Sequence, residues 1–574
     1  MGKKYLITSF SNLNYKSFKN FIFADEYLFR LYQKENLKKI KYDFANSIHS
    51  IENFRHNKNY FLKKIIAYRK QLANHLNIFH STNYTKEYWG LILDAFLLNL
   101  IDTLIKEIKL IKNVKKKFRN ICTNDFLFTQ VFFDAHELLR FASYDLDHQK
   151  LVRATIAKEI GIQIVGKKNK TQKEKYILRN SSFFNFVTNL PNFFLRSYVF
   201  IFKPTLILQG YFGIKNSIKI FFKSFGRVLF LPSNKFFYKK KYFFKIDRKA
   251  RNKIKVKEND LLDRVFNLLV GKLLPATYLE GFHFTKRQDL FFAKRISKIG
   301  SAVNLGINDH YNFLVAEILK NKGKLLTFQH GGCIEEPIFY PQIILEEKYS
   351  TKRYLWTNPK GLGQHFLTRY KKILRSNIKN NKQILIFPTR ISFHSVHSCN
   401  MKKNNHPYLD QNYDFFKYLN KKNKHRVLIK LFPNAISENV KKIWKKKFKN
   451  NINFAKTYTH KKVHFYNSRL VVINDISTPL YELMYIGVPF ILVSDNKFNE
   501  LNTKFVKKFK KLEKLKILYT SPIKAAEFVN NNYDTIDDWW KIVSKEKNFI
   551  NFKNTLFTEK NDYINSITKE LINI

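Results

Sequence analysis

Apolar residues follow different patterns along the chain, and each pattern predicts its own kind of element. Residues 5–9 form a strand candidate, and residues 18–31 contain a second apolar patch. From residue 60 to residue 114 the apolar positions recur at the spacing of an amphipathic helix. Residues 183–231 are both aromatic and basic. They predict either a pair of core helices or a face that lies on a membrane, because lysine stems cover apolar surface in both settings.

After residue 274 short apolar runs alternate with helical patterns. The expected strands are 302–305, 325–328, 384–387, 427–431, 470–473 and 490–493, with helices at 311–321, 413–419, 440–448 and 480–486. Strand, helix and strand at this spacing predict parallel βαβ units. The polar, basic segment 371–382 is a linker candidate. We therefore expect an α/β fold with two domains, residues 1–375 with helical insertions and residues 383–574.

Composition supports a folded protein. Hydrophobic residues make up 45% of the 574 residues, and there are only 17 Gly and 13 Pro. Such a chain is too apolar for a disordered or low-complexity protein. The formal net charge is +60. It is either an electrostatic footprint for nucleic acid or anionic lipid, or a result of AT-rich coding DNA, which favours Lys, Asn, Ile, Phe and Tyr. We prefer the second explanation for most of the charge.

Few features indicate export. Cys122, Cys333 and Cys399 are too few for a disulfide framework. The first ten residues lack the apolar core of a secretory signal, and no charge-free apolar run reaches the roughly 18–20 residues of a membrane-spanning helix. We expect a cytoplasmic protein, with association to the inner face of the membrane as an alternative.

Polar or glycine-bearing loops follow four of the expected strands. Ligands of open parallel sheets bind beyond the carboxyl ends of the strands. The first loop contains Gln329, His330, Gly331 and Gly332. Two glycines let the backbone turn tightly and offer amide donors to an anion. His330 is a candidate acid–base group, although an ordinary strand-end turn would have the same composition.

The second and third loops carry basic residues. Arg390 is suited to a bidentate phosphate contact, and Lys430 ends a buried strand, where it needs an anion or a path to solvent. His394, His397 and Cys399 also lie in the second loop. Their spacing matches no usual zinc arrangement, so a substrate loop or a solvated loop is preferred to a zinc site.

The fourth loop has the strongest local signal. Thr478 as N-cap and Pro479 at the first helical position begin a helix that Gly487 ends. A helix start at the carboxyl end of a strand is an anion site. Glu482 lies on the same helix face as Thr478, where its carboxylate can accept hydrogen bonds from two ribose hydroxyls. Ser477 completes this loop.

Several motifs are missing. The chain has no phosphate-binding Walker loop, no Gly-x-Gly-x-x-Gly, no nucleophile elbow and no nucleic-acid fold signature. Residues 145–147 match the Asp-x-Asp of some sugar transferases, but so short a match arises by chance and its setting is helical. We therefore expect no metal, no cofactor and no specific nucleic-acid partner.

An ordered series of motifs resembles a family of bacterial transferases encoded with surface-polysaccharide genes. That family is related to the two-domain GT-B glycosyltransferases, which include capsule-type CMP-Kdo transferases. The matching segments, in order, are 5–8, 21–27, 72–77, 83–89, 274–280, 329–332, 477–478 and Glu482. The chain departs from the family pattern after Trp89 and after Gly332, which leaves the acceptor side open.

The resemblance implies two Rossmann-like domains with a helical N-terminal elaboration, and a metal-independent transfer from a nucleotide-activated sugar. CMP-sugars are among the donors to consider, and a glycan or lipid-linked molecule is the implied acceptor. The implied substrate-binding residues are Gln329, Gly331, Gly332, Arg390, Lys430, Ser477, Thr478 and Glu482. The candidates for the base that activates the acceptor are His330, Asp309 and Glu280.

Two alternatives remain open at this point. One is a non-catalytic binding or scaffold protein of polysaccharide assembly that uses the same fold. The other is a basic protein that binds an anionic membrane surface or nucleic acid.

Overall fold

A computed structural model describes most of the chain. The described residues are 4–7, 20–23, 41–44, 51–123, 126–127, 131–144, 146–165, 169–170, 197–232, 245–332, 340–373, 381–388, 406–433, 437–449, 451–456, 458–494 and 503–574. Within these ranges the three large sheets are wholly parallel. The predicted α/β class is therefore confirmed.

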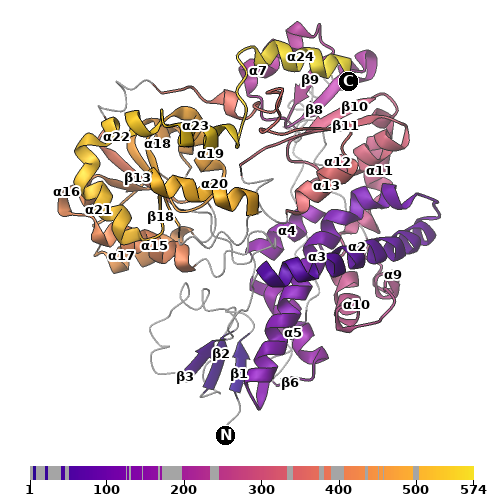
Figure 1. Ribbon diagram of the computed structural model, residues 1–574. Helices are drawn as coiled ribbons and strands as arrows, with labels where there is room; N and C mark the ends of the chain where they lie inside the picture. Colours follow the sequence, from indigo (N-terminus) through magenta and orange to yellow (C-terminus); the bar gives the residue numbers. More distant parts are fainter. Residues whose placement is uncertain are drawn as a thin grey trace, which may run out of the picture.

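The N-terminal part forms a small sheet beside long helices (Figure 1). The strand order is β3-β2-β1-β4-β6, with bounds Lys41–Phe44, Asn20–Phe23, Lys4–Ile7, Ile121–Thr123 and Gln163–Ile164. The helices are α2 (Ile51–His80), α3 (Lys86–Lys117), α4 (Ala135–Tyr144) and α5 (Leu146–Glu159), and a separate pair joins β5 (Phe126–Leu127) to β7 (Asn169–Lys170). The helical pattern expected over 60–114 corresponds to α2 and α3.

Helix α3 is long and apolar enough to cross a membrane by length and composition. However, 83% of its most apolar window is buried inside the protein. One continuous apolar core includes α2 and α3 and extends into the helices of the middle part of the chain. A core helix of a folded domain accounts for this burial.

The middle part forms the second sheet, in the order β12-β11-β10-β8-β9. Its strands are β8 (Thr205–Leu208), β9 (Val228–Leu231), β10 (Lys298–Ser301), β11 (Lys324–Phe328) and β12 (Lys352–Tyr354). Its helices are α7 (Ile214–Lys223), α9 (Arg248–Lys253), α10 (Leu261–Leu273), α11 (Phe282–Ala293), α12 (Asp309–Lys320) and α13 (Pro341–Tyr349), with short 3-10 turns η3 (Ala276–Tyr278) and η4 (Leu367–Arg369).

The C-terminal part forms the third sheet, in the order β15-β14-β13-β16-β17-β18. Its strands are β13 (Gln383–Phe387), β14 (Val427–Ile429), β15 (Asn453–Phe454), β16 (Ser468–Ile473), β17 (Phe490–Val493) and β18 (Leu518–Tyr519). Its helices are α15 (His406–Tyr418), α16 (Lys421–His425), α17 (Ser437–Lys447), α18 (Lys461–Tyr466), α19 (Thr478–Ile486), α20 (Thr503–Lys514), α21 (Pro522–Asn532), α22 (Ile536–Val543) and α23 (Lys547–Asn554), with the 3-10 turn η7 (Tyr533–Thr535).

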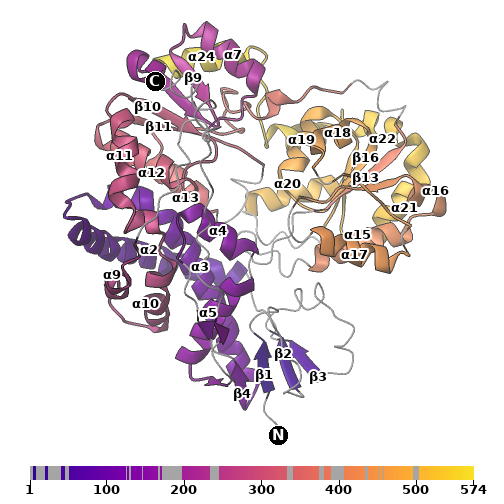
Figure 2. The same ribbon diagram turned by 180° about the vertical axis from the view of Figure 1, so that it is seen from behind.

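The last helix, α24 (Tyr563–Asn573), returns to the second sheet. Thr205 Oγ1 donates to the Leu571 carbonyl at 3.4 Å, and Lys298 Nζ donates to the Ile572 carbonyl at 3.1 Å. Figure 1 and Figure 2 both place α24 beside α7 and β9. The division into residues 1–375 and 383–574 stays a prediction about folding units, to which the structure adds this crossing of the C-terminal helix.

Two expectations about elements are wrong. Residues 302–305 are the turn after β10, because the strand itself is Lys298–Ser301. Gly300 within it allows close packing, since a Cβ there would lie 2.7 Å from Ile207 Cδ1. Within the segment 183–231, where a pair of core helices was one expectation, residues 183–196 lie outside the described residues and residues 197–202 are helical. Residues 205–231 form a β8-α7-β9 unit, so two strands stand where helix was expected. Short apolar runs do not distinguish a buried strand from a buried helix.

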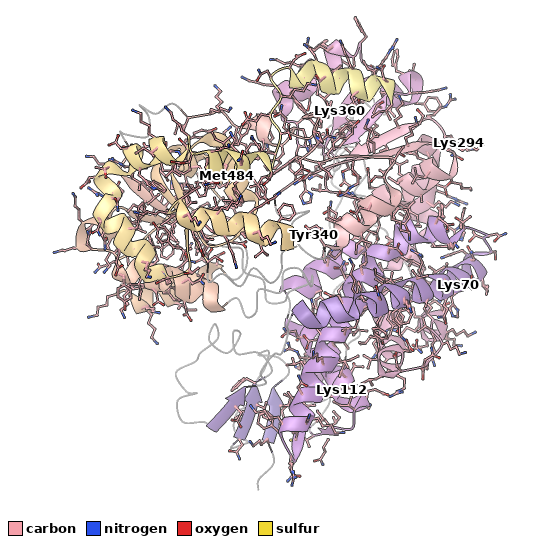
Figure 3. The ribbon with its side chains drawn as sticks, viewed as in Figure 1. Lys70, Lys112, Lys294, Tyr340, Lys360 and Met484 are labelled. Atoms are coloured by element: carbon pink, nitrogen blue, oxygen red, sulfur yellow. The ribbon has the colours of Figure 1, made fainter. Side chains whose placement is uncertain are left out.

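Lysine side chains cover separate regions of the surface. Figure 3 labels Lys70, Lys112, Lys294 and Lys360, which are exposed and come from distant elements. A charge spread in this way gives a general attraction for anions. It does not mark one site.

Candidate functional site

Two of the four predicted loops meet where the second and third sheets face each other. The Gly332 amide, after β11, donates to Thr478 Oγ1 at 3.1 Å, at the start of α19. A Cβ on Gly331 would lie 2.8 Å from Thr478 Oγ1, and a Cβ on Gly332 would lie 2.0 Å from the Tyr481 ring. Both positions therefore require glycine because the loop is pressed against the helix. We call residues 329–332 with the first turn of α19 the loop–helix junction.

Helix α19 begins one residue earlier than expected. Ser477 is its N-cap, with no side-chain capping bond in the described structure, and Thr478 is its first helical residue. The prediction of Thr478 as N-cap is wrong, because the Thr478 hydroxyl accepts from Gly332 of the facing loop. The predicted end is confirmed, since Gly487 takes the left-handed conformation at φ 88°. The start of α19 retains the polarity that attracts an anion.

Gln329 shapes the loop from inside the protein. Its amide nitrogen donates to the Gly331 carbonyl at 2.8 Å, and its amide oxygen accepts from the Trp356 backbone at 2.8 Å. Its own carbonyl accepts from the Trp356 indole at 3.1 Å and pairs with His365 Nε2 at 2.7 Å. The buried Gln329 side chain thus fixes the backbone that presents the next three residues.

His330 carries a basic ring atom without a partner among the described residues, as does His365, whose Nε2 bonds the Gln329 carbonyl. The Nδ1 of His330 is buried and has no hydrogen-bond partner within the described part of the chain. The ring also bonds the Ala302 backbone, a contact that Nε2 must make. Burial lowers the pKa of His330 from 6.5 to about 4. The imidazole is therefore neutral at pH 7, and with its proton on Nε2 the Nδ1 lone pair can accept a proton.

Asp309 lies in a buried polar cluster at the start of α12. Its carboxylate accepts from Thr277 Oγ1 at 2.5 Å, from Tyr278 OH at 3.1 Å and from the Ala135 amide at 3.1 Å. Burial and the nearby Asp134 raise the pKa of Asp309 to about 7, and the three donors oppose that shift. These partners hold η3 and the start of α4 against α12.

Glu280 forms a buried ion pair. Arg251 Nε and Nη2 donate to its two oxygens, each at 2.7 Å, and both side chains are buried. Arg251 also donates to the carbonyls of Gly271 and Leu274. The structure thus places Asp309 and Glu280 in contacts that tie helices together, apart from the loop–helix junction contacts.

Glu482 is fully buried beneath the junction. Tyr370 OH donates to Oε1 at 2.5 Å, and Lys461 Nζ forms an ion pair with Oε2 at 2.7 Å. Burial and Glu482 raise the pKa of Tyr370 far above its usual value. The carboxylate thus joins the end of η4 to α18 and α19. Its expected contact with a ribose stays a prediction.

Of the two loops with candidate phosphate-binding residues, the structure describes Lys430 but not Arg390. Lys430 is buried, and its ammonium donates to the Lys456 carbonyl at 2.9 Å. Burial, and then Lys441, lowers the pKa of Lys430. Arg390 lies outside the described residues, and so do His394, His397 and Cys399. Over the described ranges no group of three His, Cys, Asp or Glu side chains could hold a metal ion, and metal independence stays a prediction.

Sequence reasoning missed a basic group beside the junction. Arg369, at the end of η4, stacks on Phe366 with 4.5 Å between guanidinium carbon and ring centre, and lies 5.4 Å from Tyr211. The loop 209–213 after β8 holds positive φ at Gln209 (56°) and Tyr211 (58°). Strain at non-glycine residues gathers at functional sites. The signal available in the sequence was the pair Gly210 and Gly213 directly after an apolar run.

Three solved structures are similar to part of the chain at low identity. A crystal structure of Anabaena Alr3699/HepE in complex with UDP and glucose is 11% identical, with 64% of this chain and 98% of that chain covered and a TM-score of 0.35. The wall teichoic acid polymerase TagF is 11% identical, covering 68% and 98%, with a TM-score of 0.32. Acinetobacter baumannii MurG is 8% identical, covering 65% and 100%, with a TM-score of 0.32.

No curated protein matches the sequence. A family model, described as LIC12162 family transferase, matches residues 4–571, nearly the whole chain. The match includes all three sheets, the loop–helix junction and most of the returning helix α24. The expected transferase class is confirmed by this match, and the chain belongs to the LIC12162 family of transferases.

Proposed function

We propose that this transferase moves a sugar from a nucleotide-activated donor to an acceptor hydroxyl at the loop–helix junction. One observation carries the proposal. A neutral histidine with a free, buried Nδ1 stands next to two glycines that are pressed onto a helix N-terminus, at the carboxyl ends of two parallel sheets. This combination brings a proton acceptor from the loop and an anion site from the helix together at one junction.

The donor phosphates would lie at the start of α19. Backbone N–H groups of a helix N-terminus bind phosphate oxygens, and the helix dipole favours their charge. Arg369 is half-buried nearby. Its guanidinium stacks on Phe366 and hydrogen-bonds the Tyr370 side chain, and its remaining N–H donors can contact an anion. Lys461 lies on the α18 side, where the Glu482 carboxylate balances its charge.

The reaction would proceed by attack of the acceptor oxygen on the anomeric carbon. The new carbon–oxygen bond forms as the bond from that carbon to the donor phosphate oxygen breaks, and the nucleotide leaves with the bonding electrons. The acceptor hydroxyl proton passes to His330 Nδ1. Fixed donors aimed at the leaving phosphate would stabilise its charge, which is the main electrostatic demand of such a transfer.

The finer identity of the substrates rests on the sequence resemblance. The motif series resembles a family related to the GT-B glycosyltransferases, which include capsule-type CMP-Kdo transferases, so we propose a CMP-activated sugar as the first donor to test. UDP-, GDP- and ADP-sugars are the competing donors. The acceptor would be a surface glycan or its lipid-linked precursor.

A nucleotide-binding experiment tests the donor site. We expect one of CMP, UDP, GDP and ADP to raise the melting temperature of the purified chain, because a ligand that binds only the folded state stabilises it. The Arg369→Gln variant should bind that nucleotide about tenfold more weakly, the loss of one charge-assisted contact. Arg264→Gln is the matched control, because Arg264 forms an exposed ion pair with Glu159 on α5.

Either of two results would overturn the proposal. If none of the four nucleotides shifts the melting temperature at millimolar concentration, the donor site is absent. If a nucleotide binds but its sugar conjugates are never consumed in the presence of membrane lipid and glycan acceptors, the junction is a binding site in a non-catalytic protein.

A further inference from the structure

Helix α7 exposes an apolar stripe to solvent. Ile214, Ile218 and Phe222 are 80%, 50% and 70% exposed. They are spaced four residues apart, so they lie along one side of the helix. Lysines follow each of them in the next position and form a second stripe beside the first: Lys215, Lys219 and Lys223, all exposed.

The same helix already has a separate face toward the protein core. Ile220 is fully buried in an apolar cluster with Tyr563, Ile567 and Leu571 of α24. A surface helix ordinarily turns its apolar stripe to the core and its polar residues to water. Helix α7 buries one apolar face and presents another, so core packing does not explain the exposed stripe.

The apolar surface extends beyond α7. Phe225, in the turn after the helix, is 92% exposed, and Ile201 and Phe202 are 65% and 64% exposed. Tyr198 joins these segments, because its hydroxyl donates to the Gly226 carbonyl at 3.0 Å and its ring lies 6.0 Å from that of Phe221. We call this the α7 surface, made of Ile201, Phe202, Ile214, Ile218, Phe222 and Phe225 with the neighbouring lysines.

Along the sequence that contains the α7 surface, charge has one sign, although the packed helix α24 carries Asp562 and Glu570, the second of which is paired with Lys352. No Asp or Glu occurs between Lys175 and Ile246, while Lys203 and Arg227 flank the apolar residues just named. A stripe of apolar side chains beside a stripe of lysines is the pattern of helices that lie in a membrane interface. A nucleic acid would satisfy the lysines but would leave the isoleucines and phenylalanines in water.

We infer that the α7 surface docks on an anionic lipid bilayer. The phenylalanines and isoleucines would enter the headgroup boundary, and the lysines would contact lipid phosphates. Figure 1 and Figure 2 place α7 at an outer end of the molecule, where a flat surface can reach it.

This docking would bring the lipid surface close to the loop–helix junction. Helix α7 begins directly after the loop 209–213, and a Cβ on Gly213 would lie 3.3 Å from Arg369 Cγ. If the proposed function holds, the acceptor is therefore of the lipid-linked class, presented from the bilayer on which the protein rests. The docking itself does not depend on donor binding.

Vesicle flotation of the full chain tests the inference without any nucleotide. We expect binding to vesicles of phosphatidylcholine with phosphatidylglycerol, and much weaker binding to phosphatidylcholine alone. Ile218→Ser/Phe222→Ser keeps the net charge and should bind at least about tenfold more weakly, because it removes apolar area from the lipid. Lys215→Gln/Lys219→Gln should lose about fivefold for each lysine removed.

A control double variant on another helix distinguishes docking by the α7 surface from a general attraction of the positively charged protein to anionic vesicles. Ile542 is 64% exposed on α22 and follows the exposed Lys541, so Lys541→Gln/Ile542→Ser should bind vesicles like the wild type. Equal binding by Ile218→Ser/Phe222→Ser and the wild type would overturn the inference. So would a wild-type dimer that this variant converts to a monomer, because a second copy of the chain would then be the occupant.

A last measurement keeps the two proposals distinct. The α7 variants should melt like the wild type and bind the nucleotide with unchanged affinity, since their side chains point to solvent. Vesicle binding without any nucleotide response would leave the docking intact and overturn the donor site. A nucleotide response without vesicle binding would do the reverse.

Discussion

Two regions of the molecule hold the three candidate bases, and they differ in how those residues are bonded. Around η3 and α12, Asp309 accepts three hydrogen bonds and Glu280 binds Arg251 through both oxygens. At the loop–helix junction, His330 keeps a basic atom without a partner among the described residues. In the first region the carboxylates are hydrogen-bonded to residues of neighbouring helices. In the second region the His330 Nδ1 atom has no such partner within the described ranges and can accept a proton.

This difference ranks the three candidate bases. A catalytic base must reach the proton that it removes, and a carboxylate enclosed by its own donors has little capacity for a further partner. His330 is neutral and stands beside the helix start that would bind phosphate. Asp309 and Glu280 are better explained as structural groups, because removing either would leave buried donors unsatisfied.

The largest expected effect is on the rate. His330→Ala should lower kcat by a factor of about 10²–10⁴, the usual contribution of a general base. The melting temperature should change little, because the lost contact is one hydrogen bond to the Ala302 backbone. His136→Ala, at an exposed position on α4, is the control and should retain full activity. A fully active His330→Ala protein would contradict the assignment of the catalytic base to the loop–helix junction.

The second effect is on stability. Glu280→Ala leaves the buried Arg251 guanidinium without its carboxylate, which should cost about 3–5 kcal/mol of unfolding free energy. Glu159→Ala breaks an exposed pair with Arg264 and should cost less than about 1 kcal/mol. Denaturant titration measures both. The activity of the folded fraction should stay within about twofold in each variant, the expectation for changes remote from the reacting atoms.

A large loss of kcat in folded Glu280→Gln protein, at unchanged stability, would contradict this assignment. It would place a catalytic group in the region that we assign to structure.

The third effect concerns the close contact between the loop 329–332 and the Tyr481 ring of α19. Gly332→Ala puts a Cβ within 2.0 Å of the Tyr481 ring, so the loop must shift. We expect kcat/KM to fall about tenfold, because small displacements of reacting groups are costly. Tyr481→Ala lacks the Cγ, Cδ2 and Cε2 atoms that the new Cβ would meet, so the double variant should recover part of the loss in a double-mutant cycle. Strictly additive effects of the two changes would show that the contact does not position the loop.

The sequence predicted much of this arrangement from local rules. Strands β11, β13, β16 and β17 were expected within two residues of their observed bounds, because each is a buried apolar run with a polar loop after it. The rule that ligands bind beyond the carboxyl ends of parallel strands selected both loops of the junction. It could not show that they touch, because the contact between Gly332 and Thr478 joins residues of different sheets.

The partners of Glu482 and Asp309 could not be predicted from local sequence patterns either, because they also come from distant parts of the chain. Tyr370 and Lys461 are unremarkable in the sequence, and only the fold brings both to Glu482. The enclosure of Asp309 depends on Thr277, Tyr278 and Ala135, which come from two other segments. Sequence patterns indicate which residues are polar and where strands end, but the satisfaction of a buried group depends on partners distant in the chain.

Acid should destabilise the protein through its buried histidines. Burial lowers the pKa of His80, His148 and His330 to about 4 and that of His365 to about 3. The unfolded chain therefore binds protons between pH 6.5 and pH 4 that the folded chain does not, and stability falls as the pH falls through this window. Asp309 acts in the opposite direction, since its raised pKa of about 7 costs stability as the pH rises from 3.8 to 7.

The smallest expected effect is the pH dependence of catalysis, measured on the folded fraction. A base with the His330 pKa of about 4 stays about 97% unprotonated at pH 5.5, so kcat/KM should change by less than about 10% between pH 7.5 and pH 5.5. A histidine at its ordinary pKa of 6.5 would by then be about 90% protonated, with a matching loss of rate. An acidic limb between about pH 6 and pH 7.5 would thus assign the base to a group other than His330. That group would be either a solvent-exposed histidine or Asp309, and in the second case the region that we describe as structural would hold the catalytic proton acceptor.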